Sequence, residues 1–294
     1  MTATAAPFLQ NIAKQITDQL DRIPELLPFP AVAARLVAAC RDASTSSKDL
    51  VEIAQCDPAI ASKLLSVANS SMYGYSGRIR TVQHAVVVLG FREVARLALS
   101  VAAQALFTKG KTAKEKREAL WNHSLGVATV ARMLVQHVQG MLPDEAFLAG
   151  IFHDVGKLLF YKLVPEPYEH FVGRYEQADH WPPDQVVSEE KETFGIAHGE
   201  LGQRCGESWG LTNEINSAVA QHHTAHSTTP PLALVTGAAD VLARAWQIGS
   251  DLPPARPETA NPYLELLGVD QEILETVREE ASKTYQEVRQ ACLA

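Results

Sequence analysis

Cysteine, long hydrophobic runs and export signals are scarce in this sequence of 294 residues. The four cysteines lie far apart and form no Cys-x-x-Cys pair: Cys40, Cys56, Cys205 and Cys292. They indicate no disulfide-dense framework and fit a reducing cytoplasm. The longest purely apolar stretches, such as residues 85–91, are far shorter than the ~20 residues that span a bilayer, and residues 1–10 contain no Lys or Arg. We therefore expect a cytoplasmic protein that has no membrane segment.

Positive charge is also in deficit. Lys and Arg number 26 against 34 Asp and Glu, so the net charge is −8 and the isoelectric point is near 5.7. A field of this sign repels polyanions. Residues 109–117 carry five basic side chains and one acidic one, but they lack the interleaved aromatic residues of a nucleic-acid site. We expect no nucleic-acid partner.

Strand signals are nearly absent, and helix signals replace them. Residues 31–40 have the Ala and Leu content and the apolar spacing of a helix, and Asp57-Pro58 has the cap and first-turn proline that begin one. Further helices are predicted at residues 82–89, 91–106, 115–137, 144–153, 198–209, 213–223, 232–247 and 271–290. Interruptions are predicted at residues 165–183 and 251–262, which are rich in proline. The expected fold class is all-α, with a split near residue 110 between an N-terminal bundle and a histidine-bearing second half.

The second half contains a set of side chains suited to metal binding. In chain order they are His123, His153, Asp154, His198, His222, His223 and Asp240. Divalent first-row metals accept imidazole and carboxylate ligands, and two ions held close together are a common hydrolytic arrangement. Asp240 lies within the mostly apolar residues 232–246, where a buried carboxylate must be paired, hydrogen-bonded, metal-bound or protonated. From the residues alone, a metal centre and a set of hydrogen-bonded core side chains both remain open.

Lys157 adds a cation to this set, four residues after His153. If one helix continues through Gly156, the two side chains share a face, where the ammonium could contact a phosphate oxygen. A glycine at this position can instead end the helix. The sequence leaves both arrangements open.

Several ordered motifs resemble those of a known family. The order of the histidines and aspartates, with His-Asp-Val-Gly-Lys at residues 153–157, resembles the HD superfamily of metal-dependent phosphohydrolases. The chain resembles the HDOD domain more closely, over roughly residues 26–225. The motifs that carry this resemblance are Leu27-Pro28-Phe29-Pro30, Asp57-Pro58-Ala59-Ile60, residues 64–74, residues 79–85 with Leu89-Gly90, and residues 194–202 with Trp209-Gly210-Leu211.

The resemblance implies an all-helical HDOD fold and a role in bacterial signal transduction. It divides the chain into an N-terminal helical extension at residues 1–25, an HDOD N-terminal bundle at residues 26–110, an HD-like metal-binding half at residues 111–250, and a linker with a C-terminal helix at residues 251–294. The partners it implies are signalling proteins, with a nucleotide or cyclic dinucleotide as a further ligand. Many members lack HD metal ligands, so membership alone does not imply catalysis.

Similarity to the HD-GYP phosphodiesterases implies roles for the individual residues. One ion would be held by His123, His153, Asp154 and Asp240. A second would be held by His198, His222 and His223, with Asp154 bridging the two. Asp154 and Lys157 would be the catalytic residues, because Lys157 matches the lysine that grips phosphate. The cofactor would be one or two divalent ions, and the donor set does not distinguish iron, manganese, zinc and nickel.

The chain departs from the HD-GYP pattern at two places. Residues 224–230 lack the Gly-Tyr-Pro motif, and Ala119 stands four residues before His123, where a trinuclear site would have an acidic ligand. We therefore expect neither a third metal nor cyclic di-GMP hydrolysis by the HD-GYP route. Two functions remain: a regulatory HDOD protein that keeps a metal site and acts through protein partners, or a binuclear phosphohydrolase acting on a nucleotide or cyclic nucleotide.

Overall fold

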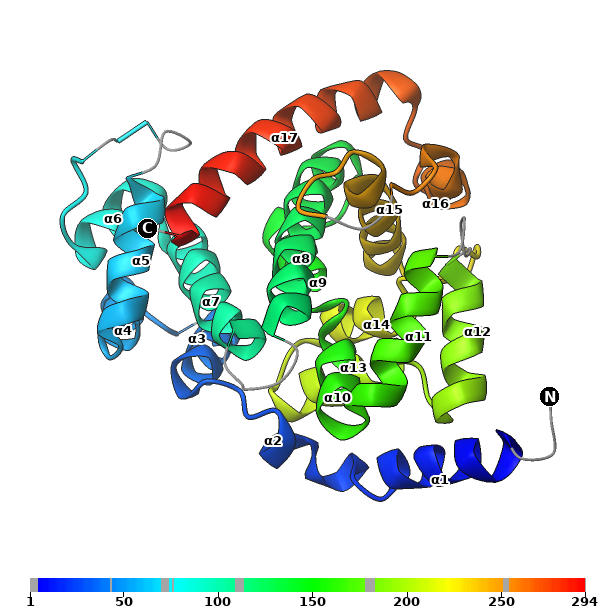
Figure 1. Cartoon of the computed structure of the whole chain (residues 1–294). Coiled ribbons are helices and arrows are strands. Elements are labelled where there is room, and N and C mark those ends of the chain that lie inside the picture. The colour runs from blue at the N-terminus through cyan, green and yellow to red at the C-terminus, as the bar shows by residue number, and fades with distance from the viewer. Residues whose placement is uncertain are drawn as a thin grey trace.

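The computed structural model describes residues 5–42, 44–69, 74–75, 77–108, 114–177, 183–250 and 254–293. These residues form helices, turns and connecting segments, with no strand among them, as the sequence predicts (Figure 1). The first elements are α1 (Ala5–Thr17), the 3-10 helix η1 (Leu20–Arg22), α2 (Ile23–Leu26), α3 (Ala31–Arg41), α4 (Ser47–Gln55), α5 (Pro58–Ala68), α6 (Val82–Leu89) and α7 (Phe91–Thr108).

The second half continues the helical pattern and carries all the candidate ligands. Its elements are α8 (Lys114–Leu134), η3 (Val135–His137), α9 (Pro143–Phe152), α10 (Val155–Leu163), α11 (Pro165–Gln177), α12 (Pro183–Phe194), α13 (His198–Ser208), α14 (Asn213–Gln221) and α15 (Pro231–Ala245). The chain then forms η4 (Pro257–Ala260), α16 (Asn261–Leu267) and α17 (Gln271–Leu293).

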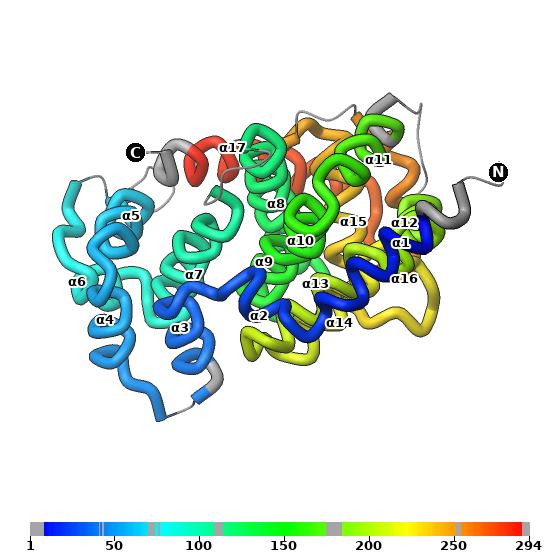
Figure 2. Tube along the Cα trace, turned by 60° about the horizontal axis from the view of Figure 1, so that its bottom comes forward, coloured from blue at the N-terminus to red at the C-terminus, as the bar shows by residue number. Residues whose placement is uncertain are grey.

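Local capping explains where the helices of the N-terminal bundle begin. The Ser46 hydroxyl accepts the backbone N–H of Asp49, whose carboxylate accepts the N–H of Ser46 in return, so a capping box starts α4. The Asp57 carboxylate accepts the N–H of Ala59 at the start of α5, and Pro58 occupies the first helical position, as predicted. Helices α3 to α7 pack on one another at one end of the molecule (Figures 1 and 2).

Both ends of the chain reach across to distant elements. Helix α17 packs on α8 and on α5, so it joins the second half to the N-terminal bundle. Helix α1 lies beside α12, and the Gln15 side-chain amide donates to the carbonyl of Leu163 at the end of α10 (Figure 2). The Trp209 indole donates to the carbonyl of Leu27, and its ring stacks on Phe29 at 4.7 Å. Buried apolar side chains from α1 to α17 form one cluster.

Two glycines allow the close helix contacts that build the site. A Cβ at Gly156 in α10 would lie 1.9 Å from the carbonyl oxygen of His198, the first residue of α13. A Cβ at Gly150 in α9 would lie 2.4 Å from the Cα of Ala128 in α8. These helix pairs therefore approach at their backbones, which brings α8, α9, α10 and α13 together around one point.

The prolines of residues 165–183 separate successive helices, as predicted, but the segment also forms a helix over residues 165–177, which was not predicted. Pro165 is the first residue of α11, and Pro183 is the first residue of α12. Proline is tolerated there because a first-turn N–H has no partner within the helix. Pro257 begins η4 for the same reason, within the linker predicted at residues 251–262. The division of the chain at residues 25, 110 and 250 stays a prediction.

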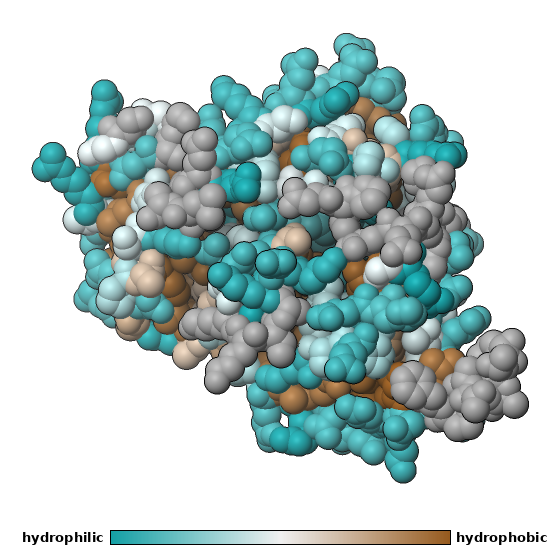
Figure 3. Space-filling model, in the orientation of Figure 1, coloured by the Kyte–Doolittle hydropathy of each residue, from teal (hydrophilic) through white to brown (hydrophobic). Residues whose placement is uncertain are grey.

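One face of the molecule is mostly polar where its residues are described. Figure 3 shows hydrophilic residues over most of one face, with smaller hydrophobic areas between them. Among the described residues, the exposed large hydrophobic side chains are Val87, Leu142 and Leu266. In the described part of the chain no single helix has the length and apolar character to cross a bilayer, although the bent pair Leu20–Leu26 and Ala31–Cys40 passes on length and composition.

Candidate metal centre

The structure brings all seven predicted ligand side chains together. Their positions are His123 within α8, His153 at the end of α9, Asp154 directly before α10, His198 at the start of α13, His222 and His223 directly after α14, and Asp240 within α15. Most of them sit at helix ends, where side chains from different helices converge. The seven fall into two groups of possible ligands, in each of which one donor atom per residue lies within 4.8 Å of the others.

The first group consists of His123, His153 and Asp240. The Nε2 atom of His123 lies 2.9 Å from Oδ1 of Asp240, and the Nε2 atom of His153 lies 4.0 Å from the same oxygen. A buried Asp240 needs a hydrogen-bonding or charged partner, and His123 is that partner.

The second group consists of Asp154, His198, His222 and His223. The Nε2 atom of His198 lies 3.3 Å from Oδ1 of Asp154 and 3.3 Å from Nε2 of His222. The other oxygen of Asp154, Oδ2, faces the first group, at 3.3 Å from Nε2 of His153. Asp154 thus lies between the two groups, with one oxygen toward each.

Several buried polar atoms in this cluster lack a hydrogen-bond partner among the described residues. They are Nδ1 of His123, Nε2 of His153, Oδ1 of Asp154 and both ring nitrogens of His223. Buried polar atoms without partners are costly and are rare in native proteins. A gathering of lone-pair donors in one place is the chemistry that a divalent cation satisfies, so the residues present fit such an ion.

Charge and protonation also suit cation binding. Burial and the neighbouring His153 lower the pKa of His222 to about 3. Burial and His222 likewise lower the pKa of His223 well below its ordinary value, so both imidazoles are neutral at neutral pH. Burial acts to raise the pKa of Asp154, but His153 and Lys157 outweigh it and hold the pKa well below the ordinary value. The cluster therefore offers the neutral imidazoles of His222 and His223 beside the ionised carboxylate of Asp154.

Main-chain carbonyls orient two of the histidines. Nδ1 of His153 lies 2.7 Å from the carbonyl oxygen of Gly150, and Nδ1 of His222 lies 2.8 Å from that of Val219. In each case Nδ1–H donates, which leaves the lone pair on Nε2. The Nε2 atoms are the ones that face the cluster.

His198 is oriented by a residue that sequence reasoning missed. Its Nδ1 atom lies 2.6 Å from Oε2 of Glu190 on α12, a side chain with no exposed surface. A signal was present, because Val186, Glu190 and Phe194 recur at helical spacing and are all buried. A carboxylate on such an apolar stripe requires a partner. No helix is predicted over residues 184–197, so this spacing does not enter the sequence prediction.

Lys157 contacts Asp154 by a route that neither sequence alternative described. Helix α9 ends at Phe152, directly before His153, and α10 begins at Val155, so Gly156 lies inside α10 instead of ending a helix. The Nζ atom of Lys157 lies 2.6 Å from Oδ2 of Asp154, and the Lys157 side chain is 24% exposed. The ammonium therefore stands between the buried cluster and solvent.

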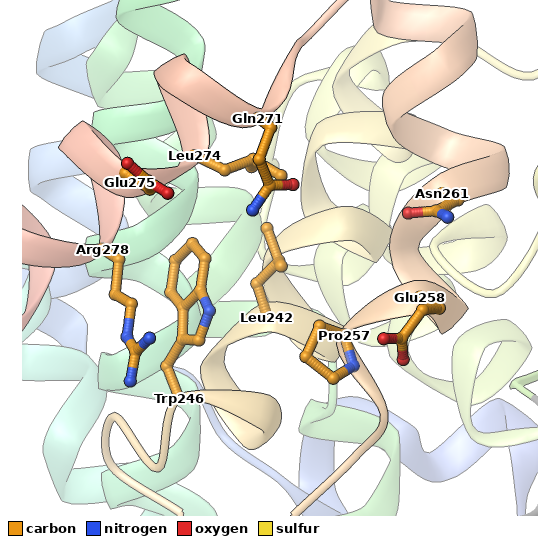
Figure 4. A pocket seen from close by; sticks show the side chains of 9 residues that line it. All are labelled: Leu242, Trp246, Pro257, Glu258, Asn261, Gln271, Leu274, Glu275 and Arg278. Atoms are coloured by element: carbon orange, nitrogen blue, oxygen red, sulfur yellow. The ribbon is translucent and has the colours of Figure 1, made fainter.

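Two hollows lie away from the cluster. One, of about 350 Å³, is lined by residues of α15, η4, α16 and α17, among them Trp246, Glu258 and Arg278 (Figure 4). The other, of about 400 Å³, has walls that include Phe91 of α7 and Leu148 of α9. Neither is lined by any of the seven cluster residues.

Comparison with known proteins identifies the class of this fold. The HDOD domain family matches residues 26–225, and the chain belongs to that family. Its fold is shared by a crystallised HDOD domain protein of unknown function from Geobacter sulfurreducens, with a TM-score of 0.77, 19% identity, and coverage of 96% of this chain and 98% of that one.

Two further relatives extend the comparison. A candidate phosphohydrolase from Shewanella amazonensis SB2B has a TM-score of 0.74 and 21% identity, over 95% of this chain and 98% of its own. An uncharacterized protein of Treponema pallidum (strain Nichols) is 24% identical in an alignment of 218 residues that covers 72% of this chain. This chain spans only 40% of the length of the Treponema protein. The likeness to the two crystal structures concerns the fold.

Proposed function

We propose that this chain is a regulatory protein of the HDOD family whose His and Asp cluster binds two divalent cations, and that it acts through protein partners in the cytoplasm. The observation that carries the proposal is the pair of ligand groups, His123, His153 and Asp240 on one side and His198, His222 and His223 on the other, with Asp154 between them. This arrangement supports the assignment of one ion to each group.

Bound ions would tie together elements that meet at the cluster. The seven ligands come from α8, α15 and the ends of α9, α10, α13 and α14. Since α8 packs on α7, and α17 joins α8 to α5, the cluster is linked by direct packing to the N-terminal bundle. A change in ion occupancy would therefore alter the stability of helices that a partner protein could contact.

The regulatory proposal is tested by measuring ion binding and phosphoester hydrolysis on the same protein. The purified chain, supplied with Mn²⁺ or Zn²⁺, should bind the ions without hydrolysing phosphoesters, and its thermal stability should rise on binding. Hydrolysis of a nucleotide at an ordinary enzymatic rate, abolished in Asp154→Ala, would overturn this proposal.

A second function is supported by Lys157. Its ammonium contacts Asp154 and is partly exposed, so it could bind a phosphate oxygen of a substrate that approaches from solvent. In such a binuclear phosphohydrolase, the bound ions would lower the pKa of a water molecule and stabilise charge that develops on phosphorus oxygens. Asp154 would contact both ions, one through each of its oxygens. The substrate would be a nucleotide or cyclic nucleotide.

The phosphohydrolase alternative requires that Lys157 contribute to hydrolysis but not to metal binding. With bis(p-nitrophenyl) phosphate as a general probe and Mn²⁺ in excess, hydrolysis should be lost in Lys157→Ala while metal content stays unchanged. Lys162→Ala is a matched control, because Lys162 lies in the last turn of α10, where its ammonium contacts the carbonyl of Leu26. Activity that survives in Lys157→Ala would argue against phosphate binding by this residue.

A further inference from the structure

The carboxylate of Glu190 contacts His198 of the second ligand group, although Glu190 is not one of the possible ligands. Glu190 lies on α12, has no exposed surface, and sits on the buried stripe with Val186 and Phe194. Its neighbour Tyr168 packs against Phe194, with ring centroids 5.6 Å apart. Burying an ionised carboxylate in aromatic surroundings is unfavourable unless its oxygens are paired. Packing alone therefore does not explain a glutamate at this position.

Each oxygen of Glu190 has a hydrogen-bond donor. Oε2 accepts the backbone N–H of His198 at 2.8 Å and lies 2.6 Å from Nδ1 of the same residue. Oε1 accepts the Tyr168 hydroxyl at 3.4 Å. Burial and the charge of Glu190 raise the pKa of Tyr168 well above its ordinary value, so the hydroxyl stays protonated and donates.

This double contact fixes His198 at both its backbone and its ring. His198 is the first residue of α13, and its N–H has no partner within the helix, so Glu190 also satisfies a helix terminus. With Nδ1–H donated to Glu190, the lone pair of the ring lies on Nε2. That atom faces Oδ1 of Asp154 and Nε2 of His222, each 3.3 Å away.

The other oriented histidines lack such a partner. His153 and His222 donate Nδ1–H to main-chain carbonyls, which are neutral. A carboxylate in the same place makes the imidazole a stronger electron donor to a metal and locks its tautomer. His198 therefore differs from His153 and His222 in that the group accepting its Nδ1–H carries a charge.

We infer that Glu190 is a positioning residue for the second ion, because it holds His198 in the Nδ1–H tautomer with Nε2 directed between Asp154 and His222. The inference rests on the proposed metal centre for its effect on ions, but the tautomer is a property of the metal-free protein. The contact also links the cluster to the N-terminal extension, because α12 is the helix on which α1 packs.

The test compares three variants of the full chain. Glu190→Gln keeps an oxygen that accepts the two N–H groups without charge, whereas Glu190→Leu removes the acceptor. Glu189→Gln is the matched control, because Glu189 precedes Glu190 on the same helix but is 31% exposed, and its oxygen lies 3.9 Å from the guanidinium of Arg174. Circular dichroism and thermal melting establish that each variant folds.

The first readout is the tautomer of His198 in metal-free protein, measured by ¹⁵N nuclear magnetic resonance of the imidazole nitrogens. We expect the Nδ1–H form in the wild type, in Glu190→Gln and in Glu189→Gln, and a loss of that preference in Glu190→Leu. If Glu190→Leu folds and keeps the wild-type tautomer, the inference is wrong. If Glu190→Leu does not fold, Glu190→Gln decides through the second readout.

The second readout is ion affinity, measured by titration with Mn²⁺ or Zn²⁺. We expect Glu190→Gln to weaken the second ion by about 10- to 100-fold and to leave the first ion unchanged, as removal of a carboxylate behind a metal-bound histidine typically does. Unchanged affinity in both Glu190 variants would overturn the inference. If the wild type itself binds no ion, the proposed function fails, and the tautomer measurement alone decides the role of Glu190.

Discussion

Nε2 of His123 on α8 lies 2.9 Å from Oδ1 of Asp240 on α15, although the two residues are 117 positions apart in the chain. Helices α8 and α15 pack on each other, so this contact joins two of the central helices of the second half. Burial acts to raise the pKa of Asp240, but the hydrogen bond from His123 outweighs it and holds the pKa well below the ordinary value. An ionised Asp240 can therefore both accept this bond and serve the first ion.

The two ligand groups should be separable by mutation. We expect His123→Ala to lose the ion of the first group and keep the other, and His222→Ala to do the reverse, because each histidine belongs to one group only. Metal analysis of the purified variants would give about one ion per chain in each case. Loss of both ions in either variant, with the fold intact, would show that the two groups form one cooperative site.

Divalent ions should stabilise the folded protein. An ion that binds only the native state adds about 2.7 kcal/mol per site when its free concentration is 100 times its Kd. We therefore expect the melting temperature to rise with added Mn²⁺ or Zn²⁺ and to fall with a chelator. His226→Ala is a suitable control, because His226 follows the cluster in sequence but is not one of its possible ligands. His226→Ala should keep the full rise in melting temperature. If that rise is lost in this variant, the stabilising ion does not bind at the cluster alone.

The contact between α10 and α13 should tolerate no side chain at Gly156. We expect Gly156→Ala to destabilise the protein by ~1–3 kcal/mol, because its Cβ would lie 1.9 Å from the carbonyl oxygen of His198. Gly173→Ala on α11 is the matched control, since a Cβ there meets nothing within 4 Å. It should stabilise the helix by about 0.5–1 kcal/mol. Denaturant unfolding measures both, and equal effects would contradict this packing.

The cysteines should differ in reactivity. Burial raises the pKa of Cys205 to about 12, so its thiol stays protonated at pH 8 and its sulfur is inaccessible. Cys56 is exposed. Peptide mapping after treatment with a maleimide should find Cys56 labelled and Cys205 protected in the native protein, and both labelled in denaturant. Native labelling of Cys205 at the rate of Cys56 would show that α13 opens readily.

The sequence could predict the candidate ligands but not all the contacts that hold them in place. The seven candidate ligands were recognisable because their order matches a family pattern, and the apolar residues around Asp240 indicated that it needs a partner if it is buried. The helix predicted at residues 144–153 agrees with α9, but the separate helix α10, which begins at Val155, was not predicted.

Proline explains the largest error. A cluster of prolines predicts interruption, but a proline in the first turn of a helix is compatible with helix formation, and Pro165 and Pro183 each occupy that position. Glu190 lies beyond this segment, within residues 184–197, for which no helix is predicted. Its tertiary partner, His198, also lies on another helix, so no local pattern paired the two residues.

The most direct test of the proposed metal centre is the metal content per chain, measured on protein purified without a chelator or a histidine tag. We expect about two ions per chain in the wild type and none in Asp154→Ala, because Asp154 has one oxygen toward each ligand group. His137→Ala, which changes a histidine outside both groups, should keep both ions. A folded wild-type protein that contains no metal and takes up none on titration would contradict the proposed metal centre.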